Sequence, residues 1–242
     1  MNTRILVLSC EHAVNTVPAA YQKYFIDHEA LLNTHRGIDF GALAIARHLS
    51  KAFDCDLVQA KATRLLIDCN RRLTNPACFS EITAGLPKAE KQAIIEEYYL
   101  PFREHVISII SNYIALGYEV WHFSIHSFTP VMNDLPRNAD IGFLYDPKRI
   151  KERMLARAWQ SILKAETDQF RVRLNYPYLG ITDGFTSFLR KQFDGAMYVG
   201  LEVENNQALM GNDHSLMQVA EALVLTLRPL LATPYNVLSA YK

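Results

Sequence analysis

The sequence has few cysteines, and none of them lies in a metal-binding or disulfide pattern. Cys10, Cys55, Cys69 and Cys78 show no CxxC spacing among the 242 residues. Their density is far below that of a disulfide-stapled secreted domain. We therefore expect reduced thiols and a cytoplasmic protein. Cys10 and Cys69 lie near other polar residues and are possible metal ligands, but small buried thiols are the preferred interpretation.

An excess of charge of either sign is also lacking. The chain has 25 basic and 25 acidic residues, so neither nucleic acid nor an anionic membrane is indicated as its main partner. No apolar run approaches the roughly 20 residues of a spanning helix, and residues 1–4 lead into a short strand instead of a signal-peptide core. These absences favour a small molecule as the partner. They leave the oligomeric state open.

No repeat, low-complexity tract or flexible linker divides the chain, and half of its residues are hydrophobic. We therefore expect a single domain over residues 1–242. Helical and strand patterns alternate, which predicts an α/β fold with a central mixed, largely parallel sheet between helices, a three-layer α/β/α arrangement. Helical periodicity covers residues 38–53, 88–116, 147–164 and 213–231, and strand patterns cover residues 4–9, 56–60, 64–68, 119–126, 141–145, 170–175 and 196–204.

Two further expectations concern interruptions and loops. Pro101 lies inside the helical pattern of residues 88–116. It has no amide donor, so we expect a break or kink there. Residues 129–139 and 176–186 are the loops expected to shape a pocket.

A histidine lies at the end of one predicted strand. The segment EVWHFSIHSFTP, residues 119–130, alternates apolar and polar side chains and carries His126 to the point where the strand gives way to a loop. A second predicted strand, residues 4–9, runs into Glu11 and His12. Ligands and catalytic groups collect at strand ends in α/β proteins. Two imidazoles there, with carboxylates nearby, favour a metal-assisted hydrolase.

A serine nucleophile is the competing mechanism, with Ser127 beside His126. Adjacent residues on a strand point to opposite faces, and the sequence contains no GxSxG elbow. Cys₂His₂ and HExxH signatures are absent as well. The residues alone therefore do not specify zinc.

Three other groups carry charge at the ends of predicted elements. Asp39, in HRGID, lies at the start of a predicted helix. An acid at this position can serve simply to stabilise the helix dipole, an effect worth about 0.3–1 kcal/mol. Asn70 and Arg71, in RLLIDCNRR, suit bidentate recognition of a carboxylate, with a solvated basic loop as the alternative. Glu202 and Glu204, in GLEVENN, share one face of a strand. Two carboxylates there are costly unless paired, protonated or metal-bound, so a functional role is favoured.

Seven segments spread over most of the chain form an ordered set: CEHAVNTVP (10–18), HRGIDFGALAIA (35–46), RLLIDCNRR (64–72), IHSFTP (125–130), PRNADIGFLYD (136–146), YPYLGITDGFTSFLR (176–190) and GLEVENNQ (200–207). This set resembles the N-formylglutamate amidohydrolase family. Members are metal-dependent amide hydrolases related in fold to the zinc carboxypeptidases and aspartoacylases. The set is more specific for the family than for its substrate.

The resemblance implies a three-layer α/β/α domain with one divalent metal, with zinc as the expected ion, at the strand ends. Matched by motif, His12 and His126 become the imidazole ligands. The carboxypeptidase pattern His-x-x-Glu is not kept, because Asn15 lies three residues after His12. We therefore expect Asp39 as the carboxylate ligand, with Glu11 as the alternative, since zinc accepts either.

The same resemblance assigns the remaining roles. Glu202 matches the late-strand glutamate that acts as general base in the carboxypeptidases. Asn70 and Arg71 match a pair that holds a substrate carboxylate, with Arg64 as a further candidate. Arg137 is expected to stabilise the oxyanion or a second carboxylate.

Together these assignments predict a zinc-dependent amidohydrolase that cleaves the N-acyl bond of a small, carboxylate-bearing amino-acid derivative. The family implies N-formyl-L-glutamate, giving formate and L-glutamate. Glu204 stands where many members carry arginine, and this reversal of charge bears on which substrate is accepted. The alternatives are hydrolysis of another N-acyl amino acid or of a C-terminal peptide bond, and a non-catalytic protein that binds an amino-acid or cell-wall ligand on the same fold.

Overall fold

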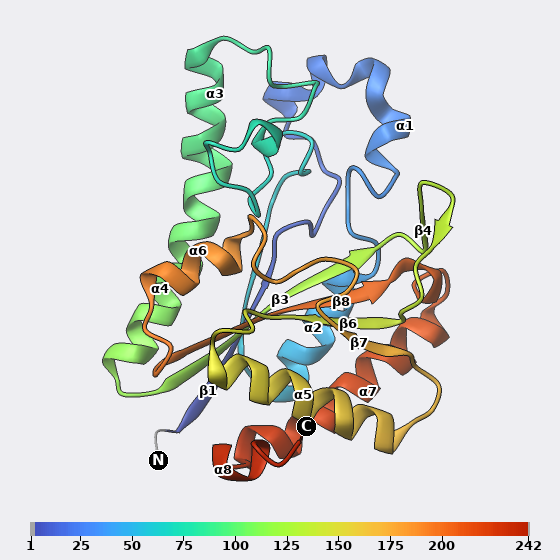
Figure 1. Ribbon diagram of the computed structural model, residues 1–242. Helices are drawn as coiled ribbons and strands as arrows, with labels where there is room; N and C mark the ends of the chain where they lie inside the picture. Colours follow the sequence, from blue (N-terminus) through green and yellow to red (C-terminus); the bar gives the residue numbers. More distant parts are fainter. Residues whose placement is uncertain (1–2, 242) are drawn as a thin grey trace.

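The computed structural model describes residues 3–241, which fold around one six-stranded sheet (Figure 1). Its strands are β1 (Arg4–Cys10), β2 (Asp56–Gln59), β3 (Glu119–Phe128), β6 (Ile141–Leu144), β7 (Val172–Leu174) and β8 (Tyr198–Asn206). The order across the sheet is β2-β1-β3-β8-β6-β7. The first four are parallel, whereas β6 runs antiparallel to β8 and parallel to β7. The expected mixed, largely parallel sheet is confirmed.

Helices cover both faces of the sheet, which completes the three layers (Figure 1). One face packs against α2 (Ala42–Phe53), α5 (Ile150–Glu166), α7 (Asp213–Ala232) and the short α8 (Tyr235–Leu238). The other packs against α3 (Lys88–Ile94), α4 (Leu100–Ala115) and α6 (Phe185–Gln192). Shorter pieces are α1 (Glu29–Leu32), the 3-10 turns Ala19–Tyr24, Ile26–His28, Pro76–Cys78 and Gln207–Leu209, and a hairpin of β4 (Val131–Met132) and β5 (Leu135–Pro136).

Among the described helices, α7 alone is long and apolar enough, by length and composition, to cross a membrane. Here it buries one side, including Leu223 and Leu227, in the core beside the sheet. Core helices of globular domains commonly have this composition, because one face must be apolar.

The alternation in β3 separates a core face from a functional face. Trp121 and Phe123 belong to the hydrophobic core on the α2–α5–α7 side. His122 faces the other layer, where its ring lies 6.4 Å from that of Phe185 in α6. Every residue of β3 is buried, so polar side chains on the functional face must find internal hydrogen bonds.

The expected break at Pro101 is not present, because α4 contains Pro101 in its first turn. A π-helical turn, Ile95–Tyr99, joins α3 to α4 immediately before Pro101. Proline has no N–H to donate, but at this point the π-helical turn has already changed the hydrogen-bond pattern of the helix. The helix therefore continues through Pro101.

The predicted strand at residues 64–68 is wrong. Leu65, Leu66 and Ile67 are buried, but they lie in turns and irregular chain that pair with no strand. The Leu66 amide donates to Thr63 O at 2.9 Å and the Asp68 amide to Cys78 O at 2.7 Å. A short apolar run signals burial without specifying sheet pairing. Here the run fills the core beneath α4 instead of extending the sheet.

Candidate active site

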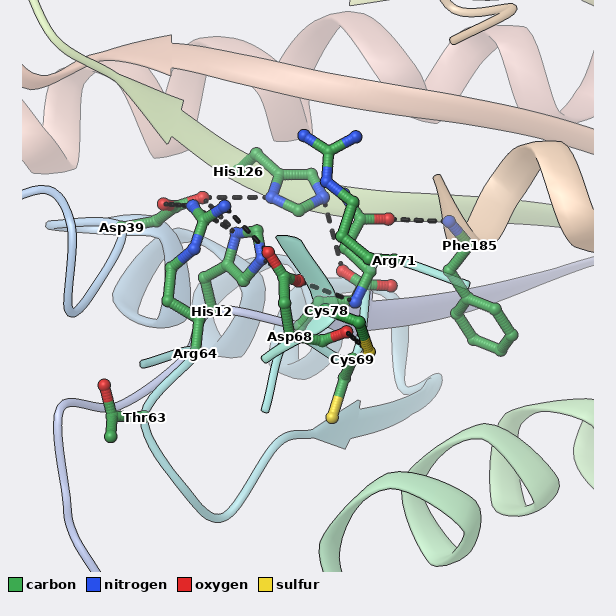
Figure 2. A network of polar contacts seen from close by, with 12 residues as sticks. His12, Asp39, Thr63, Arg64, Asp68, Cys69, Arg71, Cys78, His126 and Phe185 are labelled. Carbon is green, nitrogen blue, oxygen red and sulfur yellow. Dashed lines mark hydrogen bonds and ion pairs between the residues drawn. The ribbon is translucent and has the colours of Figure 1, made fainter. Parts of the chain in front are cut away.

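Three sequence-predicted residues meet at the carboxyl ends of the parallel strands (Figure 2). His12 follows β1, His126 lies in β3, and Asp39 precedes α2. The Nδ1 atoms of His12 and His126 lie 3.2 and 2.9 Å from Asp39 Oδ2. One ligand atom from each of the three residues falls within 4.8 Å of the others.

This group fits a divalent metal. Two imidazoles and a carboxylate form a common catalytic zinc set, with a fourth position for water. Metal–ligand bonds of about 2.0–2.2 Å in a tetrahedron place ligand atoms about 3.3–3.6 Å apart. The observed separations of 2.9 and 3.2 Å need to widen only by a few tenths of an ångström. The group contains Asp39, the preferred carboxylate, and neither cysteine named as an alternative.

The cysteine alternatives have other environments. Cys10 is completely buried in the hydrophobic core, and burial raises the pKa of its thiol well above the usual value. The Cys69 thiol donates to Tyr98 O at 3.8 Å, and burial raises its pKa as well. Both are thiols in apolar surroundings, which agrees with the interpretation preferred from the sequence, that of small buried thiols and not metal ligands.

The second ring nitrogen of each histidine contacts a residue outside the His12–Asp39–His126 group. His12 Nε2 lies 2.8 Å from Asp68 Oδ1, and His126 Nε2 lies 2.8 Å from Ser124 Oγ. Such partners fix the orientation of metal-binding imidazoles. The sequence analysis assigned no role to Asp68 or Ser124. The contact of Asp68 with His12 joins segments 56 positions apart, whereas Ser124 lies two residues before His126 on the same face of β3.

Negative charge is concentrated around this group. Five carboxylates at the site are each no more than 8% exposed: Glu11, Asp39, Asp68, Glu202 and Glu204. Burial alone would lower the pKa of His126, but its hydrogen bond to Asp39 and the nearby Glu11 raise it to about 10. His12 and His126 in turn hold the pKa of Asp39 well below its usual range, against the effect of burial. Acids buried at this density require cations, as a metal site provides.

Glu202 and Glu204 both project from β8 toward the site, but into different surroundings. Glu204 pairs in register with His126, and its buried Oε2 has no hydrogen-bond partner among the described residues. Burial raises its pKa to about 7, although His126 opposes the rise. Burial also raises the pKa of Glu202, with His126, Arg190 and Arg71 opposing.

The RLLIDCNRR segment brings Arg64, Asn70 and Arg71 to the site. Arg64 donates to Asp68 Oδ2 at 2.9 Å and lies 3.2 Å from His12 Nδ1, so its charge is largely used by the site itself. Asn70 Oδ1 accepts from the Phe185 amide at 2.6 Å, which leaves the NH₂ group of Asn70 for a ligand.

Arg71 is held at one edge of its guanidinium. Its Nη1 donates to Asp183 O at 2.5 Å. In Figure 2 the guanidinium extends toward the side of the network on which His126 lies. Its charge also lowers the pKa of Asp68. Arg71 therefore lies beside the candidate metal group, and within residues 3–241 its guanidinium makes no other hydrogen bond.

Two hollows that share part of their lining lie beside the group. The lining of a cavity of about 630 Å³ includes the basic side chains His35, Arg36, Arg64 and Arg71 and the acidic Asp68 and Glu81. A second cavity of about 300 Å³ reaches from Asp39 to the β4–β5 hairpin. His35, Arg64 and Tyr178 line both. The loops expected to shape a pocket therefore do so, through the hairpin and Tyr178.

Arg137 and Ser127 lie beside this site without joining the His–Asp–His group. Arg137 stacks over Tyr178 at 5.0 Å and donates to its hydroxyl at 3.0 Å. The Ser127 amide donates to Asp39 Oδ2 at 3.3 Å, while its hydroxyl accepts from Gln207 at 3.1 Å. Because His126 bonds Asp39 and Ser124 instead, nothing in this geometry activates Ser127 as a nucleophile.

Comparisons with known proteins bear on this geometry. The family model described as N-formylglutamate amidohydrolase matches residues 5–210. A crystal structure of a gene product from Agrobacterium tumefaciens is 32% identical, with a TM-score of 0.78 over 95% of this chain and 92% of that one. N-formylglutamate amidohydrolase from Ralstonia eutropha JMP134 has the same fold at 19% identity, with a TM-score of 0.70 over 96% and 94% of the two chains. A search of curated proteins gave no match. The extent of the family match shows that this chain belongs to the N-formylglutamate amidohydrolase family, the one that its motifs resemble.

Proposed function

We propose that this amidohydrolase uses a divalent metal, zinc, to cleave the N-acyl bond of a small amino-acid derivative in the cytoplasm. N-formyl-L-glutamate, giving formate and L-glutamate, is the first substrate to consider. The observation that carries the proposal is the buried His12–Asp39–His126 group, whose Asp39 lines a hollow that shares His35, Arg64 and Tyr178 with a larger cavity.

His12, Asp39 and His126 would hold the ion, which when bound lowers the pKa of a water molecule and polarises the scissile carbonyl. Glu11, the alternative ligand, lies on the far side of the His126 ring, 3.4 Å from Nε2. Asp39 contacts Nδ1, which is also the side of His12. This arrangement favours Asp39 over Glu11 as the carboxylate ligand.

Glu202 is the proposed general base. It must take a proton from water and return it to the leaving amine, so it has to face the substrate. A side chain added at Gly184 would meet both Asn70 Oδ1, at 3.2 Å, and Glu202 Oε1, at 3.7 Å. Glu202 therefore lies on the same side as the residues proposed to hold substrate.

Arg71 and the NH₂ group of Asn70 are proposed to bind the substrate carboxylate, supported by Arg64 from the wall shared by the two cavities. Arg137 is proposed to act from the outer rim on the oxyanion or on a second carboxylate. N-formylglutamate has two carboxylates. The one that Arg71 does not bind would lie within reach of the other basic side chains that line the larger cavity.

A panel of N-formyl, N-acetyl and peptide substrates with zinc supplied tests the proposal. We expect hydrolysis of N-acyl amino acids, loss of activity with a chelator, and preference for the free acid over its amide. Arg71→Ala should reduce kcat/KM for the acid by an amount corresponding to about 2–5 kcal/mol and hardly affect the amide. Arg71→Lys should rescue poorly, because lysine lacks the planar fork.

Arg72→Ala is the matched control. Arg72 is the next residue, but its guanidinium binds the Asp183 carboxylate at 2.6 Å and is half-exposed. This variant should keep the preference for acids. Ligand binding without turnover of any substrate would instead support the non-catalytic alternative, and equal hydrolysis of acid and amide would remove the carboxylate-reading role from Arg71.

A further inference from the structure

We propose that Glu11 is a positioning residue that keeps a proton on His126 Nε2 through the Ser124 hydroxyl, so that Nδ1, on the side of Asp39, is the nitrogen left to bind a metal. The inference rests on the proposed function, because it concerns a histidine proposed to bind the metal. It gives a role to the glutamate of the CEH motif, which the proposed chemistry leaves unused.

Glu11 is buried on the Nε2 side of His126, opposite Asp39. It is 1% exposed, and among residues 3–241 its only ion-pair partner within 4 Å is His126. Ser124 donates to Glu11 Oε2 at 2.6 Å, and Ser9 donates to Oε1 at 2.7 Å. Both serines are completely buried. A carboxylate this deep is costly, so its hydrogen bonds must be satisfied in a definite way.

The direction of these hydrogen bonds follows from chemistry. Both serine hydroxyls donate to Glu11, and each hydroxyl has only one proton to give. The Ser124 oxygen, 2.8 Å from His126 Nε2, can then only accept from that nitrogen. His126 Nε2 therefore keeps its proton. Nδ1, the atom 2.9 Å from Asp39 Oδ2, donates to that oxygen in this structure and is the nitrogen that would bind a metal in place of its proton.

A second arm from the same glutamate repeats this logic away from the site. The Ser9 oxygen lies 2.9 Å from His122 Nε2 and must accept from it, so His122 Nδ1 must accept from the Tyr198 hydroxyl at 2.9 Å. His122 contacts none of the proposed metal ligands by a hydrogen bond. Glu11 thus accepts from two buried serines, each of which contacts one histidine. Only the chain of hydrogen bonds through Ser124 reaches the candidate metal group.

This symmetry supplies a matched pair of variants, Ser124→Ala and Ser9→Ala. Each removes one buried hydroxyl that donates to Glu11. We expect Ser124→Ala to weaken zinc affinity about 10–100-fold, the usual effect of losing an outer partner of a metal-binding histidine. Ser9→Ala should change the zinc affinity by less than about 3-fold, because Ser9 is not an outer partner of a proposed metal-binding histidine. Ser124→Thr, which keeps the hydroxyl, should restore most of the affinity. Affinity is measured by competition with a chromophoric chelator, without substrate.

Nitrogen-15 NMR of the histidines supplies a readout that a packing defect does not move. In the zinc-loaded wild type, His126 should carry its proton on Nε2, and in Ser124→Ala this proton should lose its protection from exchange. A His126 proton on Nδ1 in the wild type overturns the proposal even if the Ser124 variant fails to fold.

The outcomes separate this inference from the function on which it rests. Equal zinc affinity in Ser124→Ala and Ser9→Ala overturns the positioning role while leaving the metalloenzyme intact. A wild type that binds no zinc overturns both. A drop confined to Ser124→Ala, with both variants folded by circular dichroism, supports the positioning role.

Discussion

At the scale of single residues, the two glutamates of β8 are the sharpest pair to separate. Glu204 lies opposite His126, whereas Glu202 lies near Asn70 on the substrate side. Glu202→Gln keeps the shape but cannot take a proton, so turnover should fall about 100-fold or more, the scale of general acid–base catalysis. Metal affinity should be nearly unchanged. Steady-state kinetics and chelator competition give the two numbers.

Glu204→Gln is the control for this prediction. Because Glu204 has an unpartnered buried oxygen and a pKa raised by burial to about 7, its replacement by a neutral amide should cost much less turnover. Equal losses from the two variants would show that the base is not Glu202 alone. A larger loss from Glu204→Gln would transfer the role to the residue opposite His126.

Single residues also show how far the sequence can be interpreted. His12, Asp39 and His126 could be predicted, because each occurs in a motif and two lie at strand ends, where side-chain alternation fixes their direction. The partners of those residues could not. Asp68 reaches His12 across 56 positions of the chain, and such a contact has no local pattern.

At the scale of elements, β6 depends on a glycine. A side chain at Gly142 would lie 2.0 Å from Tyr176 O, a backbone atom that cannot move aside independently. Gly142 also pairs with Glu204 in β8 and with Arg173 in β7. We expect Gly142→Ala to lower the free energy of unfolding by about 1–3 kcal/mol or more, because overpacking forces the loop away from the sheet. Urea denaturation measures this change.

Gly85→Ala is the matched substitution at an open position. A side chain there meets nothing within 4 Å, and the residue is exposed. Its effect should stay within about 1 kcal/mol and can be stabilising, since alanine restricts the unfolded chain. Similar losses at both positions would mean that the approach of Tyr176 to β6 is not the cause.

Elements differ in how readily their sequence reveals them. The strand β3 and the helix α7 have long, regular patterns and were predicted to within a few residues. Helix α6 was missed, because its first residue falls in a segment rich in glycine and aromatic residues that favoured a loop. Its start is stabilised by Asn70, whose side chain accepts from the Phe185 amide across 115 positions.

At the scale of the whole molecule, a buried neutral histidine links stability to pH. Burial lowers the pKa of His122 to about 4 from 6.5. Glu11 opposes this shift, whereas Arg190 and His126 support it. Between these two values the unfolded chain binds a proton that the folded protein does not. The contribution is therefore fully present above about pH 6.5 and is lost as the pH falls toward 4.

We expect this loss to reach about 3 kcal/mol, from about 1.4 kcal/mol per pKa unit. His122→Gln provides the comparison, because its amide can donate to Ser9 and accept from Tyr198 without titrating. Unfolding free energies of both proteins are measured without metal at pH 4.5, 5.5 and 7. Their difference should shift in favour of the variant as the pH falls, while other titrating groups largely cancel. A constant difference would contradict the prediction.

The antiparallel direction of β6 has a consequence for how this scaffold can diversify. β3 ends and β6 begins at the same edge of the sheet, since Phe128 pairs with Asn206 and Ile141 with Asn205. Residues 129–140 therefore leave and re-enter the sheet beside the candidate metal group, with no crossover helix to accommodate. Loops of this kind tolerate insertion and exchange at small entropic cost. Substrate selectivity can therefore change through this one loop, either by evolution or by grafting the loop from a relative. The strands that carry the candidate metal ligands need not change.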